Sequence, residues 1–363
     1  MAFTAKDVVT LREKTGVGMM DCKKALQQAD GDMDKAVEIL REKGLASQAK
    51  KASRVAAEGT IGVYGTAEAS ALVELNCETD FVGNNPEFKA LANRIAKTAV
   101  LARPADVEAL KAAKIADGDV TVDEAIQELF LKIRENLKLR RFAVVEGTAV
   151  SYIHAGGSVG VLVSFDTDAA DKPEFTEMGK NVAMQVAAMS PEYLSSDEIS
   201  ADELAKMKNI TIESALNKPD TLPKPILMKV INKAIAAGKL GEKDLAAYEA
   251  EKNNKFLFNF LSEEAIAAFA ETAVADKDEY TADPIFGKAI EGRINKQLKE
   301  ICLLDQAFVR SDVFDGSVGG YIANVAKALG ADIKVKGFVR FAKGEGIEKK
   351  EDNFAAEIAS MVK

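Results

Sequence analysis

The sequence predicts an α+β protein, and two observations support this fold class. Segments with strand patterning and segments with helical patterning succeed one another along the chain, and one strand-and-helix pattern occurs twice. The 363 residues are enough for roughly two or three domains with buried cores. We expect an N-terminal three-helix bundle, two duplicated α+β core subdomains, a long helical insertion and a C-terminal helix module.

Residues 1–54 are expected to form a three-helix bundle of the ubiquitin-associated type. A capping box at Thr4 begins the first helix, a glycine-containing turn ends it, and the second helix begins at Met19. Gly44 has the place of a glycine that ends the third helix. Lys50–Arg54 then reads as a basic linker, in a chain whose formal net charge is −9.

Residues 55–146 are expected to form the first core subdomain. Two strands joined by a turn of small residues form a hairpin, which ends near Cys77 and is followed by a loop. Pro86 has the first position of a helix, and a capping box at Thr121 begins another. The segment 141–146 returns as a strand.

The chain then repeats itself at a nearly constant offset. The matching segments are Glu58-Gly59-Thr60 with Glu146-Gly147-Thr148, Thr79-Asp80 with Thr167-Asp168, and Pro86-Glu87-Phe88 with Pro173-Glu174-Phe175. Self-similarity of this kind indicates a duplicated architecture. Residues 147–342 are therefore expected to form the second core subdomain. The repeat is incomplete, because Phe81 has Ala169 at its equivalent position.

A helical insertion is expected within the second subdomain, at about 195–284. Apolar residues at helical spacing indicate successive helices, one of which is expected to contain both Phe256 and Phe269. A closing strand at Gly337–Phe341 follows. Residues 343–363 are expected to form a C-terminal module that ends in a helix.

Composition and motif content exclude several classes of function. An acidic chain is a poor general binder of nucleic acid, no apolar run is long enough for a membrane span, and no glycine-rich loop has the spacing that binds nucleotide phosphates. The start lacks a signal peptide, and Cys22, Cys77 and Cys302 are odd in number and widely separated. We therefore expect a cytoplasmic protein without disulfides. With one histidine, His154, we expect neither a metal centre nor a cofactor.

Phe81, beside Asp80, is a candidate anchor for a partner. A large aromatic in a loop between a strand and a helix can protrude and bind. Alternatively, Phe81 folds onto the core while Asp80 caps the turn, and residue types alone favour this second interpretation. The repeat weighs against it, because Ala169 shows that the shared architecture does not require an aromatic side chain here.

Met19, Met20 and His154 each allow two interpretations. Adjacent methionines after a glycine turn suit an adaptable partner surface, but they also suit the core of a small bundle, and at most one of them can point fully inward. His154 flanks an expected hairpin turn. A single histidine in that place is more often structural or exposed than catalytic.

At these residues the sequence resembles bacterial elongation factor Ts. The matching segments are long and spread along the chain: Thr15–Leu26, Glu74–Val82 and Gly337–Glu348. The resemblance implies a guanine-nucleotide exchange factor for elongation factor Tu, which is not an enzyme. Such a protein would bind elongation factor Tu with GDP, promote GDP release and stabilise the nucleotide-free state until GTP binds.

The resemblance also implies roles for particular residues. The loop of Thr79, Asp80, Phe81 and Val82 would reach towards the partner's Mg²⁺ site, with Phe81 as a wedge and Asp80 disturbing the metal and phosphate environment. The other implied partner contacts are Arg12, Met19, Met20, Lys51 and His154. A last helix at about 350–362 would be a further docking element. No catalytic residue or metal ligand of the chain's own is implied.

The insertion departs from the family pattern, because shorter members have only a helical hairpin there, used in dimerisation. A homodimer through the insertion is therefore an open expectation. Two other classes of function remain as alternatives. One is a scaffold that binds partners without regard to nucleotide, and the other is an enzyme with His154 as general base, for which the sequence offers no companion motif.

Overall fold

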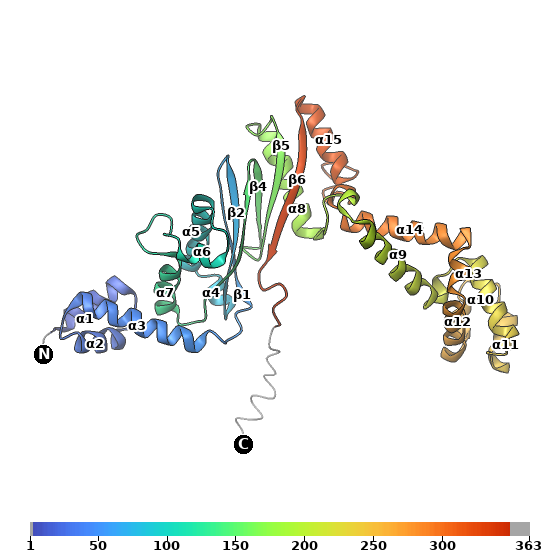
Figure 1. Cartoon of the computed structure of the whole chain (residues 1–363), viewed down its shortest axis with the longest axis horizontal. Helices are drawn as coiled ribbons and strands as arrows, with labels where there is room; N and C mark the ends of the chain where they lie inside the picture. Colours follow the sequence, from blue (N-terminus) through green and yellow to red (C-terminus); the bar gives the residue numbers. More distant parts are fainter. Residues whose placement is uncertain (1–2, 349–363) are drawn as a thin grey trace, which may run out of the picture. The chain divides into compact units, whose positions relative to one another are not determined.

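A computed structural model describes residues 3–348 of the chain (Figure 1). The chain divides into two compact units. The first takes in the chain up to Ser190, the segment Phe308–Gly316 and the chain from Gly320 onward, and the second takes in Pro191–Ala307 and Ser317–Gly319. The helix expected at about 350–362 lies outside the described residues.

The first unit begins with the expected bundle of α1 (Ala5–Thr15), α2 (Met19–Gln28) and α3 (Met33–Lys51). The capping box is formed, because Thr4 Oγ1 accepts from the Asp7 amide at 3.4 Å and the Thr4 amide donates to the Asp7 carboxylate at 2.7 Å. The helices share a core of buried apolar side chains: Val8, Leu11, Val17, Cys22, Ala25, Leu26, Ala29, Ala36 and Leu40.

The predicted end of the third helix at Gly44 is wrong, because α3 continues to Lys51. Gly44 packs against α7 (Val122–Ile133), where a Cβ on this residue would lie 2.5 Å from Leu131 Cδ2. The glycine therefore permits two helices to approach closely and does not end one. Lys50 and Lys51, expected in a linker, are the last residues of α3.

Two three-stranded antiparallel sheets follow, and each has its strands in sequence order. The first consists of β1 (Glu58–Gly65), β2 (Ala69–Cys77) and β3 (Lys138–Glu146), and the second of β4 (Ala149–His154), β5 (Val159–Thr167) and β6 (Ile333–Ala342). A long helix packs on each sheet, α5 (Pro86–Ala102) on the first and α8 (Pro173–Met189) on the second. The predicted α+β fold class is confirmed.

The two copies share irregularities as well as order. The register between the second and third strands shifts once in each copy, at Glu74/Leu75 and at Ser164/Phe165. Each covering helix ends on a non-glycine residue in the left-handed region, Arg103 with φ 48° and Ser190 with φ 47°. The two helix ends occupy equivalent positions, so the repeat extends from the sequence to the backbone there, whereas the two register shifts fall in the same strand pair but not at equivalent residues.

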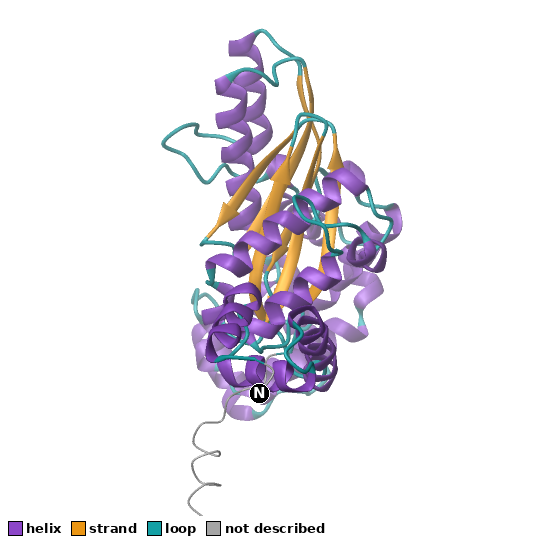
Figure 2. Cartoon of the chain, turned by 90° about the vertical axis from the view of Figure 1, so that its left-hand side faces the viewer, coloured by secondary structure: helices purple, strands orange, loops and turns teal. Residues whose placement is uncertain are grey.

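Side chains of β2 alternate between two cores, as a strand buried on both faces requires. Val73 and Leu75 belong to the core beneath α5, α6 (Val107–Ala112) and α7, whereas Leu72 belongs to a cluster shared with the second sheet. Other members of that cluster are Ile61, Leu162 and Phe341. Figure 2 shows the strands of both sheets running alongside one another.

The second unit is helical and has a core of its own. Its helices are α9 (Ala201–Leu216), α10 (Lys224–Ala236), α11 (Glu242–Glu251), α12 (Glu263–Ala275), α13 (Lys277–Thr281) and α14 (Pro284–Ile301). Phe256 and Phe269 do not share one helix, because a 3₁₀ turn occupies Leu257–Phe260 and Ser262 caps α12. After this unit, α15 (Val318–Leu329) leads to β6. None of the helices within residues 3–348 is both long and apolar enough to cross a membrane.

Candidate functional site

The segment Thr79–Val82, expected as a loop, is a short helical turn that follows β2. Thr79 caps α4 (Asp80–Gly83), because its Oγ1 accepts from the Val82 amide at 3.4 Å. At the other end Gly83 packs on β1, where a Cβ on this residue would lie 2.9 Å from the Gly59 carbonyl oxygen. A cap at one end and close packing at the other hold this turn, which we call the Phe81 turn, against the sheet.

Phe81 points into solvent, with 85% of its surface exposed. The interpretation in which Phe81 folds onto the core while Asp80 caps the turn is wrong, because Thr79 provides the cap and Asp80 is itself exposed. Burying a phenylalanine side chain contributes about 1.5–3 kcal/mol. An aromatic ring kept in water on a capped turn is therefore a ready anchor for a partner's apolar pocket.

Glu135, in the loop after α7, holds the Phe81 turn by hydrogen bonds. Its carboxylate accepts from the Thr79 amide at 2.9 Å, from the Thr79 hydroxyl at 2.7 Å and from the Glu78 amide at 3.1 Å. No motif in the sequence marks Glu135 as part of this site. It stands 56 residues from Thr79, and no local spacing pattern marks such a contact.

The bundle presents its predicted contact residues at the surface. Met19 is 40% exposed and Met20 64% exposed, so both methionines fit a partner surface and neither belongs to the bundle core. Arg12 on α1 is exposed. Lys51 is half-buried, and its Nζ donates to the carbonyl oxygen of Arg134, the residue before Glu135. The end of α3 and the Phe81 turn are therefore held by the same loop.

His154 is exposed at the end of β4, where its Nδ1 lies 2.9 Å from the Tyr152 hydroxyl. The hairpin turn after it packs on the first sheet, because the Ile61 amide donates to the Gly157 carbonyl oxygen at 2.8 Å. This contact fixes the position of His154 relative to β1.

The turn beside His154 and the Phe81 turn lie at the same end of the first unit. Lys89 on α5 connects them: its Nζ donates to Asn84 Oδ1 at 3.2 Å, next to α4, and a Cβ on Gly156 would lie 3.5 Å from the same Nζ. The structure thus brings two of the predicted contact regions together, although they are far apart in the sequence.

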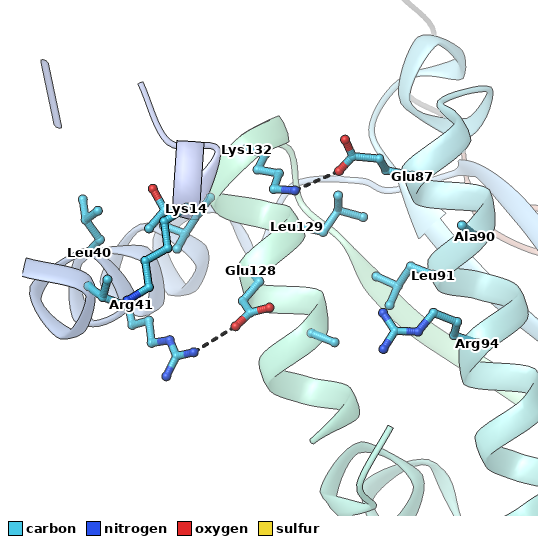
Figure 3. A pocket seen from close by; sticks show the side chains of 14 residues that line it. Lys14, Leu40, Arg41, Glu87, Ala90, Leu91, Arg94, Glu128, Leu129 and Lys132 are labelled. Carbon is cyan, nitrogen blue, oxygen red and sulfur yellow. Dashed lines mark hydrogen bonds and ion pairs between the residues drawn. The ribbon is translucent and has the colours of Figure 1, made fainter. Parts of the chain in front are cut away.

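A groove of about 410 Å³ lies between the bundle and the helices α5 and α7 (Figure 3). Two ion pairs lie in it, Arg41 with Glu128 at 2.9 Å and Lys132 with Glu87 at 3.0 Å. Their side chains are 40–64% exposed, and exposed pairs contribute only about 0–1 kcal/mol each. The predicted partner contacts line other surfaces of the bundle and core.

The cysteines are not prepared for nucleophilic chemistry. Burial, followed by the nearby charge of Glu135, raises the pKa of the Cys77 thiol to about 12. Burial also raises the pKa of Cys22 and of Cys302. A thiol that keeps its proton is a poor nucleophile. Within residues 3–348 no group of three or more histidine, cysteine or acidic side chains is placed to hold a metal ion.

Comparison with known proteins shows similarity along the whole chain. A family model described as Elongation factor TS matches residues 78–245 and 234–345. Elongation factor Ts of Clostridium perfringens (strain SM101 / Type A) is 40% identical over 364 residues, covering 99% of this chain and 99% of that protein. Elongation factor Ts of Syntrophotalea carbinolica is 38% identical over 366 residues, covering 100% of each. Elongation factor Ts of Clostridioides difficile (strain 630) is 40% identical over 365 residues, covering 99% of each.

Proposed function

The chain belongs to the elongation factor Ts family, and on this premise we propose that it is the guanine-nucleotide exchange factor of elongation factor Tu. Membership makes it a translation elongation factor. The proposal adds the mechanism. This chain binds elongation factor Tu with GDP, promotes the release of GDP, and stabilises the nucleotide-free partner until GTP binds.

The exposed ring of Phe81 is the observation that carries this proposal. The ring is presented on a turn that is capped by Thr79 and held by Glu135, so little conformational freedom is lost when it enters a pocket. An apolar wedge held in place in this way separates elements of a partner at low entropic cost. In the exchange reaction Phe81 would enter an apolar pocket of the partner's GTPase domain.

The energetics of exchange need no covalent step. If this chain binds nucleotide-free elongation factor Tu more tightly than the GDP-bound form, linkage requires that it weaken GDP binding by the same factor. Mg²⁺ is the largest local charge in a nucleotide site. The carboxylate of Asp80 is exposed beside Phe81, and in this proposal it would disturb the metal and phosphate environment of the partner. The metal is the partner's own.

In this proposal, two further surfaces contact elongation factor Tu: one on the N-terminal bundle and one beside the Phe81 turn. Arg12, Met19, Met20 and Lys51 would contact the GTPase domain through the bundle. His154 would add a contact beside the Phe81 turn. The C-terminal helix remains an expectation, because it lies outside the described residues.

This function makes the chain a cytoplasmic binding protein and not an enzyme. The alternative of an enzyme with His154 as general base predicts a turnover that collapses when His154 is replaced by Ala. The alternative of a scaffold predicts equal affinity for elongation factor Tu with and without GDP. Exchange predicts a higher affinity for the nucleotide-free form.

The release rate of fluorescent GDP from elongation factor Tu tests the proposal directly. Purified elongation factor Tu carrying the fluorescent nucleotide is mixed with excess unlabelled GDP, with and without this protein. We expect a large acceleration that depends on the concentration of this protein. Absence of acceleration from a partner shown to be active would contradict the exchange function and favour the scaffold.

The homodimer through the helical insertion stays a prediction. The insertion exposes apolar side chains on separate elements, among them Ile210 on α9 and Ile285 on α14. Sedimentation velocity of the full chain over a range of concentrations measures the oligomeric state. A species with the mass of one chain at every concentration would contradict the prediction.

A further inference from the structure

The loop Arg134–Asn136 connects the two partner-binding regions that the proposed function uses. From its geometry we infer that Glu135 is a positioning residue for exchange: it holds the Phe81 turn in the conformation that presents Phe81, and its neighbours tie that turn to the bundle. This inference rests on the proposed function and names a residue that acts through Phe81.

The orientation of the Thr79 hydroxyl depends on Glu135. A hydroxyl group has one proton to donate and lone pairs with which to accept. Thr79 Oγ1 donates its proton to Glu135 Oε1 at 2.7 Å, and the same oxygen accepts from the Val82 amide at 3.4 Å. By taking the proton, the carboxylate leaves a lone pair directed at the start of α4. Glu135 therefore sets the cap that forms the Phe81 turn.

The carboxylate of Glu78 adds a hydrogen bond in the opposite direction, from the end of β2 to the loop before β3. Glu135 Oε2 accepts from the Glu78 and Thr79 amides, while Glu78 Oε1 accepts from the Asn136 amide at 2.7 Å. The other oxygen of Glu78 pairs with Arg54 Nη1 at 3.2 Å. Two adjacent residues at the end of β2 are thus fastened to two adjacent residues before β3. Charge-assisted hydrogen bonds of this kind are stronger than neutral ones.

The same loop reaches the bundle. The Arg134 guanidinium pairs with the carboxylate of Asp21 on α2, one residue after Met20, and the Arg134 carbonyl accepts from Lys51 at the end of α3. Asn136 Nδ2 donates to the Arg54 carbonyl oxygen at 2.8 Å. Three consecutive residues therefore contact both the docking helices and the support of the Phe81 turn.

The second copy of the repeat shows that this support is not required by the architecture. There Thr167 Oγ1 accepts from the Ala169 amide at 3.0 Å, and Asp168 Oδ1 accepts from the Asp332 amide at 3.1 Å. Ala169 is buried. The Thr-Asp corner, by which we mean Thr79-Asp80 in the first copy and Thr167-Asp168 in the second, thus forms here with one side-chain hydrogen bond to the residue before the third strand. The carboxylate of Glu135 accompanies the exposed aromatic ring and is specific to that copy.

Replacing Glu135 by Gln tests the inference. An amide presents one acceptor oxygen and one donor nitrogen, so it cannot accept from all three donors that Glu135 satisfies. With wild-type protein accelerating GDP release, we expect Glu135→Gln to lower the maximal release rate about tenfold, in line with the loss of hydrogen bonds to a charged group. The concentration that gives half the maximal effect should change less than about threefold, because the docking residues remain.

A double-mutant cycle separates positioning from a general loss of structure. If Glu135 acts through Phe81, Glu135→Gln adds no further loss in a Phe81→Ala background. Equal fold-losses in both backgrounds would overturn the inference. The matched control is Glu108→Gln. Glu108 lies on α6, where its side chain is 80% exposed and pairs with Lys111. This variant should accelerate GDP release as the wild type does.

Hydrogen–deuterium exchange of the free protein provides a measurement that does not depend on elongation factor Tu. In Glu135→Gln the Val82 amide should exchange faster, while the Ala169 amide of the second copy should be unchanged. If Glu135→Gln does not fold, Thr79→Val, which removes the hydroxyl alone, should give the same two results. Unchanged protection of Val82 in a folded variant would overturn the inference. Failure of the wild type to accelerate GDP release would instead overturn the proposed function.

Discussion

The two copies of the α+β repeat have the same strand order and covering helix but different surfaces. Both have three antiparallel strands in sequence order, a register shift between the second and third strands, and a covering helix that ends in the left-handed region. In the first copy the Thr-Asp corner leads to Phe81 in solvent. In the second it leads to Ala169, which is 3% exposed. Residues common to both copies build the fold, and the residues to which we assign the proposed function are present in one copy.

The segment that follows the Thr-Asp corner differs in length between the two copies. The segment from Asp80 to Pro86 is one residue longer than the segment from Asp168 to Pro173. The longer segment forms α4, which lifts Phe81 off the sheet. In the second copy the shorter connection places Ala169 inside. The copies thus differ by one residue in this connection, and the residue after the aspartate is exposed in the first copy and buried in the second.

Phe81→Ala should produce the largest effect on GDP release, because it gives the first copy a small side chain where the second copy has Ala169. Truncating an anchor at the centre of an interface costs about 2 kcal/mol or more, so the acceleration of GDP release should fall by roughly 30-fold or more. The free energy of unfolding should change by less than about 0.5 kcal/mol, because the ring is exposed. Stopped-flow nucleotide release and urea denaturation measure the two quantities. An unchanged release rate would remove Phe81 from the mechanism.

Ala169→Phe tests whether the second copy can accept an aromatic side chain. Because Ala169 is buried, the added ring should overpack the core and lower the free energy of unfolding by about 1–3 kcal/mol. Ala170→Phe is the matched control, since Ala170 is exposed and the ring should be tolerated there. Urea denaturation compares the two variants. Equal stability of both would contradict the inward position of Ala169.

Asp168→Ala and Asp80→Ala should act on different properties. Asp168 accepts from the Asp332 amide. Asp168→Ala removes this hydrogen bond, so it should lower the free energy of unfolding by about 1 kcal/mol and leave the acceleration of GDP release unchanged. Asp80→Ala should slow GDP release while stability stays within about 0.5 kcal/mol of the wild type. Release kinetics and denaturation on the same two proteins check this. Slower GDP release in Asp168→Ala together with lower stability in Asp80→Ala would contradict this prediction.

His154→Ala should have the smallest effect, a few-fold weaker affinity for nucleotide-free elongation factor Tu. Contacts at the margin of an interface contribute less than about 1 kcal/mol. Isothermal titration calorimetry measures the dissociation constant. An affinity equal to that of the wild type would leave His154 as a surface residue of the hairpin.

Local sequence patterns predicted most elements and misplaced those that depend on packing. The capping box at Thr4 and proline at the start of α5 act within one helical turn, so the sequence alone indicates them. Gly44 has the sequence pattern of a helix end, because a glycine that ends a helix and one that admits a neighbouring helix look alike in sequence. The side chain of Leu131, far along the chain, decides between them.

The α+β class, the duplication and the family could be predicted from the sequence, because periodicity, capping and long motifs are properties of neighbouring residues. The exposure of Phe81 and the hydrogen bonds by which Glu135 holds its turn arise from the tertiary fold. Exposure depends on which segments cover a side chain, and the hydrogen bonds from Thr79 to Glu135 join residues 56 positions apart. No spacing rule connects residues at that separation, because their approach is set by how α7 and the first sheet pack together.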